Sequence, residues 1–341
     1  MSRVNQSTLV SIILSIIVVF CMIVFIGLKR ISTALSKIQG NPVPILLFLT
    51  LFTLAFGLRA LRWRAIVPEA EFSVLLRSLY VAWFFNGITP ARLGDAARIY
   101  LLKTEESVEI GEGLASVVID RILDLVCLLA IFPAYLYLTI EGEKLSTASQ
   151  FFLLATLIVT LAALVSVVLT AWKPNLIVTF IEKPIGILSQ NAAKKISQLV
   201  WSASKGIRAF GRNRKALTWS LLLSFPIWVL ESTSTYLVAQ AMGIEEVSFT
   251  LCLLAATFAF FAMTIPITPA GWGSFELAIA AVLSLVLPLE SALLVALVDH
   301  VIRQVYVALV GGVMLQTFSS NFSETLEGIK RIKSDKKLHE A

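Results

Sequence analysis

The chain has 341 residues, of which 57% are hydrophobic and only 15% are charged, and its mean hydropathy is +0.86. Soluble globular domains carry about 25% charged residues, so this composition excludes that class and indicates an integral membrane protein. A net charge of +6 would suit nucleic acid, but the basic residues flank apolar runs, where they orient membrane spans, so no nucleic-acid partner is expected.

Long apolar runs follow one another along the chain. They reach the roughly 20 residues that cross a hydrocarbon core, and they do not alternate as barrel strands do, so they are expected to be helices. Six continuous spans are predicted, at residues 8–28, 43–62, 113–139, 149–171, 216–241 and 290–318. The fold class that follows is all-α, a polytopic transmembrane helical bundle, with residues 1–341 as a single integral membrane domain.

Two further apolar regions, 72–103 and 249–288, are each interrupted by a cluster of proline and glycine. Proline lacks a backbone donor and clashes with the preceding helical turn, so neither region can be one continuous helix. Each is predicted to be a broken helical hairpin in the membrane, either re-entrant or crossing twice. The residues expected to form the breaks and to act as gates are Pro90, Gly94, Pro266, Pro269, Gly271 and Gly273.

The two interruptions are related in sequence. Ile88-Thr89-Pro90-Ala91-x-x-Gly94 recurs 179 residues later, beginning at Ile267. The same offset carries span 43–62 onto 222–241, Asp120-Arg121 onto Asp299-His300, and Asp124 onto Arg303. Two repeats are therefore predicted, at 37–140 and 216–318, and counting the spans between them makes them inverted in topology, as in many transporters. The alternative is a duplication that only gives a stable symmetric bundle.

Basic residues set the expected orientation. Segment 173–215 mixes lysine and arginine with apolar residues at helical spacing, which predicts an amphipathic helix on an anionic membrane surface; the alternative is a solvated cytoplasmic loop. This segment and the basic tail 319–341 are expected to be cytoplasmic, as are the N-terminus and Arg59, Arg62, Arg64 and Arg77. Lys29, Arg30 and Lys37 disagree, because they would fall in an outer loop.

The first hairpin carries a group of polar residues, Asn86, Arg92, Asp95 and Arg98. Arginine presents a planar fork of donors that suits phosphate, and a helix that starts near Gly94 would aim its N–H groups at an anion. We therefore expect a site for a lipid phosphate or headgroup; the alternative is an internal Asp95–Arg98 pair that fixes the hairpin. Glu276, just after the second break, is expected to belong to this site and to partner an arginine of the first hairpin.

Other ionisable residues lie inside the predicted spans. A charge near the centre of a membrane helix costs about 2.5–3.5 kcal/mol, so these side chains should face the bundle interior or an aqueous cavity. His300 is either a proton relay or a hydrogen-bonded member of a helix interface. The residues of this predicted polar pathway are Asp120, Arg121, Asp124, Glu231, Asp299, His300 and Arg303.

No pattern of a known catalytic or cofactor site occurs in the chain. Cys21, Cys127 and Cys252 all fall in apolar spans, and no pair of them has the spacing of a zinc or redox site. We therefore expect no catalytic residue, no metal and no cofactor, and a protein that is not an enzyme.

The motifs of the two breaks, Asn86…Thr89-Pro90-x-Arg92-x-Gly94-Asp95-x-x-Arg98 and Pro266…Thr268-Pro269-Ala270-Gly271-x-Gly273-x-x-Glu276, resemble those of the lysylphosphatidylglycerol synthase transmembrane-region family, the UPF0104 group. In the two-part aminoacyl-phospholipid synthases this region is associated with flipping the modified lipid. The resemblance implies a flippase in a prokaryotic cell membrane. Its expected partners are membrane lipids, either an anionic phospholipid or a polyprenyl-linked substrate, a soluble synthase, and a second copy of the chain. The aminoacyltransferase domain of those enzymes is not found here.

A flippase or translocase of a phospholipid or lipid-linked headgroup is the expected function. Two alternatives stay open. One is a membrane-embedded transferase acting on a lipid phosphate, with Asp120, Asp124 or Glu276 as the base. The other is a non-catalytic membrane partner of a separate lipid-modifying enzyme.

Overall fold

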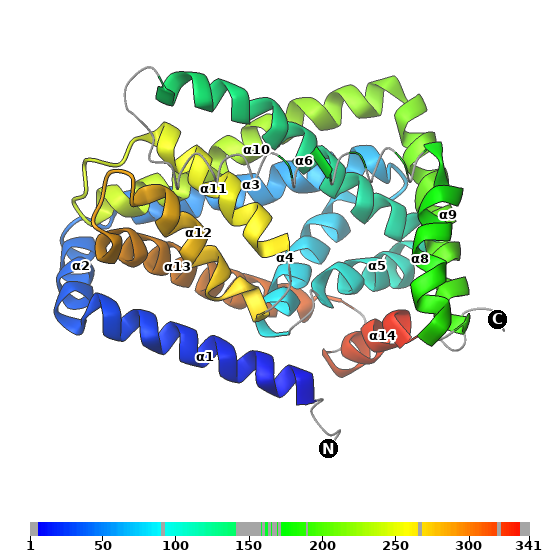
Figure 1. The fold of residues 1–341 in the computed structure, drawn as a ribbon, viewed down its shortest axis with the longest axis horizontal. Coiled ribbons are helices and arrows are strands. Elements are labelled where there is room, and N and C mark those ends of the chain that lie inside the picture. Colours follow the sequence, from blue (N-terminus) through cyan, green and yellow to red (C-terminus); the bar gives the residue numbers. More distant parts are fainter. Residues whose placement is uncertain are drawn as a thin grey trace. The chain divides into compact units, whose positions relative to one another are not determined.

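The structure, a computed structural model, describes residues 6–89, 93–140, 172–188, 190–264, 268–318 and 322–334, together with single positions between 158 and 169. Within these residues all regular structure is helical, which confirms the predicted class for this part of the chain (Figure 1). The helices are α1 (Gln6–Ile26), α2 (Leu28–Gly40), α3 (Val43–Ile66), α4 (Phe72–Ile88), α5 (Leu93–Glu106), α6 (Ile110–Ile140), α8 (Pro174–Leu188), α9 (Gln190–Arg212), α10 (Arg214–Ala241), α11 (Phe249–Thr264), the short 3-10 helix η2 (Pro269–Gly271), α12 (Ser274–Leu283), α13 (Leu289–Leu315) and α14 (Phe322–Ser334).

Three of the described helices, α3, α10 and α13, are long and apolar enough to cross a membrane, and they match three predicted spans. A bent pair, α1 and α2, makes a fourth if it counts as one span. The predicted span 113–139 is helix α6, whereas 149–171 lies almost wholly outside the described residues.

The bend between α1 and α2 corrects the sequence prediction. The two helices meet at 86° at Gly27, whose φ of 85° lies in the left-handed region that glycine adopts without strain (Figure 1). From the sequence, Lys29, Arg30 and Lys37 had been expected in an outer loop. In the structure they lie on helix α2.

Both predicted interruptions are confirmed. Helix α4 ends at Ile88 and α5 begins at Leu93, while Pro90 and Arg92 lie outside the described residues. The second interruption lies between α11 and α12 and contains η2; Pro266 is outside the described part. Gly271 and Gly273 have φ of 79° and 91°, so the chain turns here through conformations that favour glycine.

Gly94 allows a close approach at the first break. A Cβ built at this residue would run into the carbonyl group of Ala82 and lie 2.8 Å from Asn86 Cγ. Gly94→Ala is therefore expected to lower the free energy of unfolding by about 1–3 kcal/mol, the usual cost of overpacking. Thermal unfolding of the detergent-purified protein measures the loss.

Gly57→Ala is the matched control, because Gly57 lies on helix α3 and a Cβ there would meet nothing within 4 Å. This change should be neutral or slightly stabilising, since alanine is the better helix former. Equal melting temperatures for the two variants would show that the first break is looser than the structure indicates.

The basic segment and the tail are more ordered than the sequence predicted. Residues 173–215 contain two helices, α8 and α9, which pack on each other (Figure 1), where one amphipathic helix had been expected. Helix α9 also packs on α6, with Gly206 against Ala115. Residues 322–334 form helix α14, which was not predicted. Attachment to a membrane surface stays a prediction for both segments.

The chain forms two compact units. Unit 1 comprises Met1–Leu58, Arg77–Ala97 and Pro226–Ala341, and unit 2 comprises Arg59–Leu76 and Arg98–Phe225. Unit 1 takes residues from both predicted repeats, so the units do not coincide with the repeats. The inverted relation of the repeats stays a prediction.

Candidate functional site

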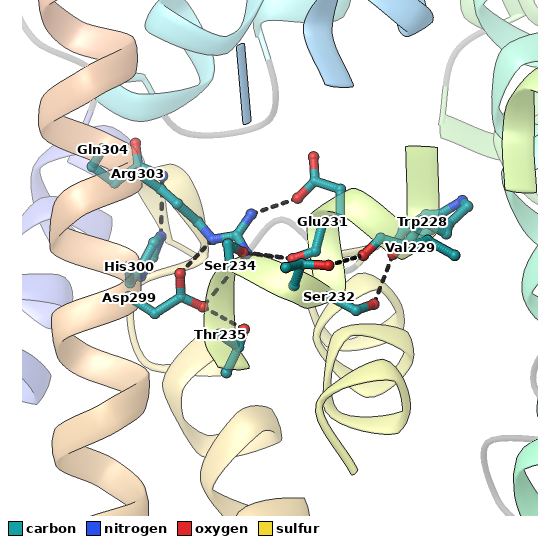
Figure 2. Close-up of polar contacts among 11 residues, drawn as sticks. Trp228, Val229, Glu231, Ser232, Ser234, Thr235, Asp299, His300, Arg303 and Gln304 are labelled. Atoms are coloured by element: carbon teal, nitrogen blue, oxygen red, sulfur yellow. Dashed lines mark hydrogen bonds and ion pairs between the residues drawn. The ribbon is translucent and has the colours of Figure 1, made fainter. Parts of the chain in front are cut away.

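Arg303 is the centre of a buried polar network in unit 1 (Figure 2). Its Nε donates to Asp299 Oδ1 at 2.8 Å, and its Nη1 donates to Glu231 Oε2 at 2.5 Å. Its Nη2 donates to the Glu231 carbonyl oxygen at 2.9 Å and to the hydroxyl of Ser234. Thr235 donates to the other oxygen of Asp299 at 2.6 Å. One guanidinium thus joins two carboxylates from different helices.

Helical spacing explains how these side chains meet. Asp299 and Arg303 are four residues apart on α13, so they lie on one face. On α10, Glu231 and Thr235 have the same spacing and face α13 (Figure 2). The result is a joint between two helices of membrane length, built from charge and not from apolar packing.

Aromatic rings surround the guanidinium of Arg303. Its Cζ lies 5.1 Å from the ring centre of Phe52, 5.7 Å from that of Phe48 and 5.8 Å from that of Phe275. These distances are those of cation–π contacts, which strengthen when water is excluded. The aromatic rings therefore give the network an environment in which separating its charges costs free energy.

A second polar chain in unit 1 leads from His300 to the second break. His300 Nδ1 lies 2.7 Å from Glu276 Oε1, and Glu276 Oε2 accepts the Gly273 N–H at 2.7 Å. On the other side of the ring, His300 Nε2 lies 3.1 Å from Gln304 Nε2 (Figure 2). Both oxygens of Glu276 are thus engaged inside unit 1, and the structure gives it other partners than the arginine of the first hairpin that the sequence had suggested.

The imidazole of His300 is enclosed by aromatic rings. Trp272 and Phe275 lie with their ring centres 4.3 Å and 4.4 Å from that of His300. Both rings belong to the turn around the second break, so the break positions the histidine, and Glu276 caps the start of helix α12. Pro269, Gly271 and Gly273 form the turn that carries Trp272.

Unit 2 contains a separate network around Arg62. Its Nη2 donates to Asp120 Oδ1 at 2.7 Å, and its Nη1 donates to Asp124 Oδ1 at 2.8 Å and to Ser224 at 2.9 Å. Asp120 also accepts from Arg98 Nη1 at 3.2 Å. Arg62 is fully buried, although it lies on a helix long enough to span a membrane.

Two more arginines adjoin this network. The guanidinium of Arg98 lies 5.0 Å from the ring centre of Trp63. Arg121 Nη1 is 3.8 Å from Asp124 Oδ2, but its side chain is 32% exposed. Arg98 therefore lies inside the network and Arg121 at its rim.

The sequence missed the role of Arg62, which had been assigned, with Arg59, only as a cytoplasmic orientation signal. The structure buries both side chains. The available signal was their position within a long apolar run, because ionisable residues inside a membrane helix are functional candidates by default.

Asn86 and Asp95 of the first hairpin have different surroundings. Asn86 Oδ1 accepts the Gly94 N–H at 2.9 Å, which ties the two sides of the first break together. One of the N–H groups that had been expected to face an anion is therefore already used. Asp95 is half-buried in the first turn of α5, and Arg92 lies outside the described residues.

The two networks match at the offset of the predicted repeat. Asp120 in unit 2 and Asp299 in unit 1 are equivalent positions, and both accept from a buried arginine. At the next equivalent position the charge is reversed, from Asp124 to Arg303. Arg62, however, falls on Ala241 at this offset, so the agreement is confined to the aspartates and the repeat stays a prediction.

Comparison with known proteins gives one family and several distant relatives. Residues 9–311 match the family described as lysylphosphatidylglycerol synthase TM region. Glycosyltransferase AglD of Haloferax volcanii is 21% identical over 330 residues, which are 88% of this chain and 52% of AglD, so the chain spans about half the length of that relative. A UPF0104 membrane protein of Methanocaldococcus jannaschii is 26% identical over 248 residues, covering 70% of this chain and 95% of the relative.

A further UPF0104 membrane protein, of Methanothermobacter thermautotrophicus, is 24% identical over 284 residues, covering 78% of this chain and 81% of its own. No solved structure matches. The family match extends over nearly the whole chain and includes both interruptions and both buried networks. The chain therefore belongs to the lysylphosphatidylglycerol synthase TM region family and is an integral membrane protein.

Proposed function

We propose that this chain translocates a phospholipid or a lipid-linked headgroup across the membrane. The observation that carries the proposal is the burial of two charged networks, around Arg62 and around Arg303, on helices of membrane length. Replacing a buried ion pair with apolar residues is often neutral or stabilising, so stability alone does not account for keeping these charges. A path for a polar headgroup does account for them.

The two breaks support the same function. Irregular backbone at membrane depth is tolerated only where it is buried in protein or lines a cavity. In the proposed mechanism a lipid phosphate takes the place of a carboxylate beside the guanidinium groups of either network, those of Arg62 and Arg98 next to Asp120 and that of Arg303 next to Asp299. The planar forks of these groups suit phosphate oxygens. For a headgroup at Arg303, the acyl chains stay in hydrocarbon beside outward-facing apolar residues of the same helix, such as Leu309 and Val313 on α13.

The relatives suggest a second candidate, a non-catalytic membrane partner of a lipid-modifying enzyme. AglD carries a region similar to this chain within a longer protein that is named a glycosyltransferase. A region similar to this chain can therefore form part of a protein that is named a transferase. The third candidate, a membrane-embedded transferase, would use a buried carboxylate such as Asp120 as its base.

Proteoliposomes with a headgroup-labelled fluorescent phospholipid separate these functions. A membrane-impermeant reductant bleaches only the outer-leaflet label in protein-free vesicles, and translocation makes the inner-leaflet label accessible without chemical change. A transferase gives a new lipid species by mass spectrometry when donor is added. A membrane partner gives neither result and co-purifies with a soluble enzyme. Bleaching confined to the outer leaflet for every lipid tested would refute translocation.

Arg98→Ala is expected to slow translocation about tenfold or more, because a hydrogen bond to a charged group contributes about 1.5–3 kcal/mol. Lys103→Gln is the matched control, since Lys103 is an exposed basic residue on the same helix, α5. Circular dichroism and size-exclusion chromatography check that both variants fold. Equal rates for the two variants would remove Arg98 from the headgroup path.

A further inference from the structure

We propose that His300 and Glu276 form a proton-binding site that couples lipid translocation to proton movement across the membrane; the coupling rests on the proposed function. The two side chains are 1% and 0% exposed and lie 2.7 Å apart, nitrogen to oxygen. Histidine and glutamate are the usual members of proton relays in transporters. What sets this pair apart is its position between the two breaks.

Three buried carboxylates and one guanidinium lie on the helices that hold His300 and its partners. On α10 and α13 the carboxylates of Glu231 and Asp299 bind the one guanidinium of Arg303, while on α12 the carboxylate of Glu276 faces the imidazole of His300. With a neutral imidazole these buried groups carry an excess of negative charge, which is costly in a low dielectric. A proton on His300 reduces that excess. The remaining titratable groups that unit 1 has on these helices and their neighbours are Cys21 on α1, Arg77 and Tyr80 on α4, Tyr236 on α10, Cys252 on α11, and Glu290 and Tyr306 on α13.

Glu276 links the proton to the second break. Its Oε1 faces His300 Nδ1, and its Oε2 accepts the N–H of Gly273, the residue that precedes helix α12. When His300 is protonated, more of the Glu276 charge is drawn to the imidazolium and less is left for the cap. The strength of the cap on the backbone turn therefore depends on the protonation of the histidine.

Gln304 links the same proton to the first break. With Nδ1–H directed at Glu276, the neutral ring accepts from Gln304 Nε2 through its Nε2 lone pair, at 3.1 Å. A proton added at this Nε2 turns it into a donor, so the amide of Gln304 must rotate to present its oxygen. That oxygen lies against the end of α4, because a Cβ at Gly87 would be 3.0 Å from it.

One proton at His300 thus acts on both interruptions at once. Toward α12 it changes the cap at Gly273, and toward α4 it changes the group that faces Gly87, next to the first break. The contacts at the start of α12 and at the end of α4 can therefore change together with proton entry and exit. This is the property that a proton-driven translocase needs.

The first test measures proton binding without transport. The chain has two histidines, His300 and His339, so His339→Asn leaves a single ¹⁵N-histidine signal in the full-length protein in nanodiscs. The signal is expected to titrate, and Glu276→Gln should change its midpoint, since the carboxylate of Glu276 is the charged group that faces the imidazole. Glu276→Gln retains an acceptor for the Gly273 N–H, so the turn should still fold. A His300 signal that does not titrate, or a midpoint unchanged by Glu276→Gln, would overturn the proton site.

The second test measures coupling in the proteoliposome assay under imposed pH gradients. One pH unit is worth 1.36 kcal/mol per proton, so imposing a gradient of that size should change the translocation rate about tenfold relative to no gradient. His300→Asn and Glu276→Gln should lose this response, while His339→Asn keeps it. A translocation rate that does not depend on the pH gradient would refute the proposed coupling but not the proposed function. Absence of translocation for every lipid tested would refute both the coupling and the proposed function. The ¹⁵N-histidine titration would still decide whether the site binds a proton.

Discussion

Replacing Arg303 with methionine is expected to lower the free energy of unfolding by about 3–5 kcal/mol, the largest loss we predict for unit 1. The reason is that the change leaves Asp299 and Glu231 buried without the guanidinium that joins them. Methionine nearly keeps the volume of the arginine side chain, so the loss of stability comes from the unpaired charges and not from a cavity. Denaturant unfolding in detergent micelles, followed by circular dichroism, measures it.

The control removes the stranded charges together with the arginine. The triple variant Arg303→Met, Asp299→Asn, Glu231→Gln should recover most of the lost stability, because no unpaired charge remains buried. Such recovery would be non-additive, as expected for residues in one network. A triple variant no more stable than Arg303→Met alone would show that the network is not held together by charge.

Arg62→Met should also destabilise unit 2, by up to about 3–5 kcal/mol, because Asp120 and Asp124 lose their shortest ion pairs while Arg98 and Arg121 remain near them. Arg121→Met is the matched control on the same carboxylates. Its pair with Asp124 is 3.8 Å long and its side chain is 32% exposed, so removing it should cost less than about 1 kcal/mol.

The two arginine variants are compared by the same unfolding measurement, and the difference between them is the informative quantity. The two arginines differ in burial, with side chains 1% against 32% exposed, and in the length of their ion pairs with Asp124, 2.8 Å against 3.8 Å. Equal losses for Arg62→Met and Arg121→Met would mean that burial does not set the strength of this network.

Much of the fold follows from local sequence. Apolar runs placed α3, α10 and α13 to within a few residues, and proline and glycine placed both interruptions. The bend at Gly27 was missed because a glycine after an apolar run also marks the end of a span. Helix α14 was missed because a charged tail has no apolar run to signal a helix.

The members of the buried networks could be predicted, but their pairing could not. A charged residue inside an apolar run is costly to bury, and it can be recognised from the sequence on either side of it. Asp120, Asp299 and Arg303 were therefore identified as interior residues. The partner of Asp120 is Arg62, 58 positions earlier on another helix, and only the packing of the two helices brings them together. Arg62 was instead interpreted as a residue that orients its span in the membrane, because it lies at the end of the predicted span and basic residues at that position usually have this role.

The account depends on a lipid headgroup meeting the buried polar face of the bundle while the acyl chains stay outside. Helix α13 offers both faces within unit 1: Asp299, His300 and Arg303 are buried, whereas Val305, Leu309 and Val313 are exposed. The most direct measurement is photo-crosslinking in proteoliposomes with two phospholipid probes, one with the photoreactive group in the headgroup and one with it in the acyl chain, mapped by mass spectrometry of α13 peptides. We predict headgroup crosslinks at residues 299–303 and acyl-chain crosslinks at 305, 309 and 313. Headgroup crosslinks confined to the ends of the helix, with residues 299–303 unlabelled by the headgroup probe, would contradict the account.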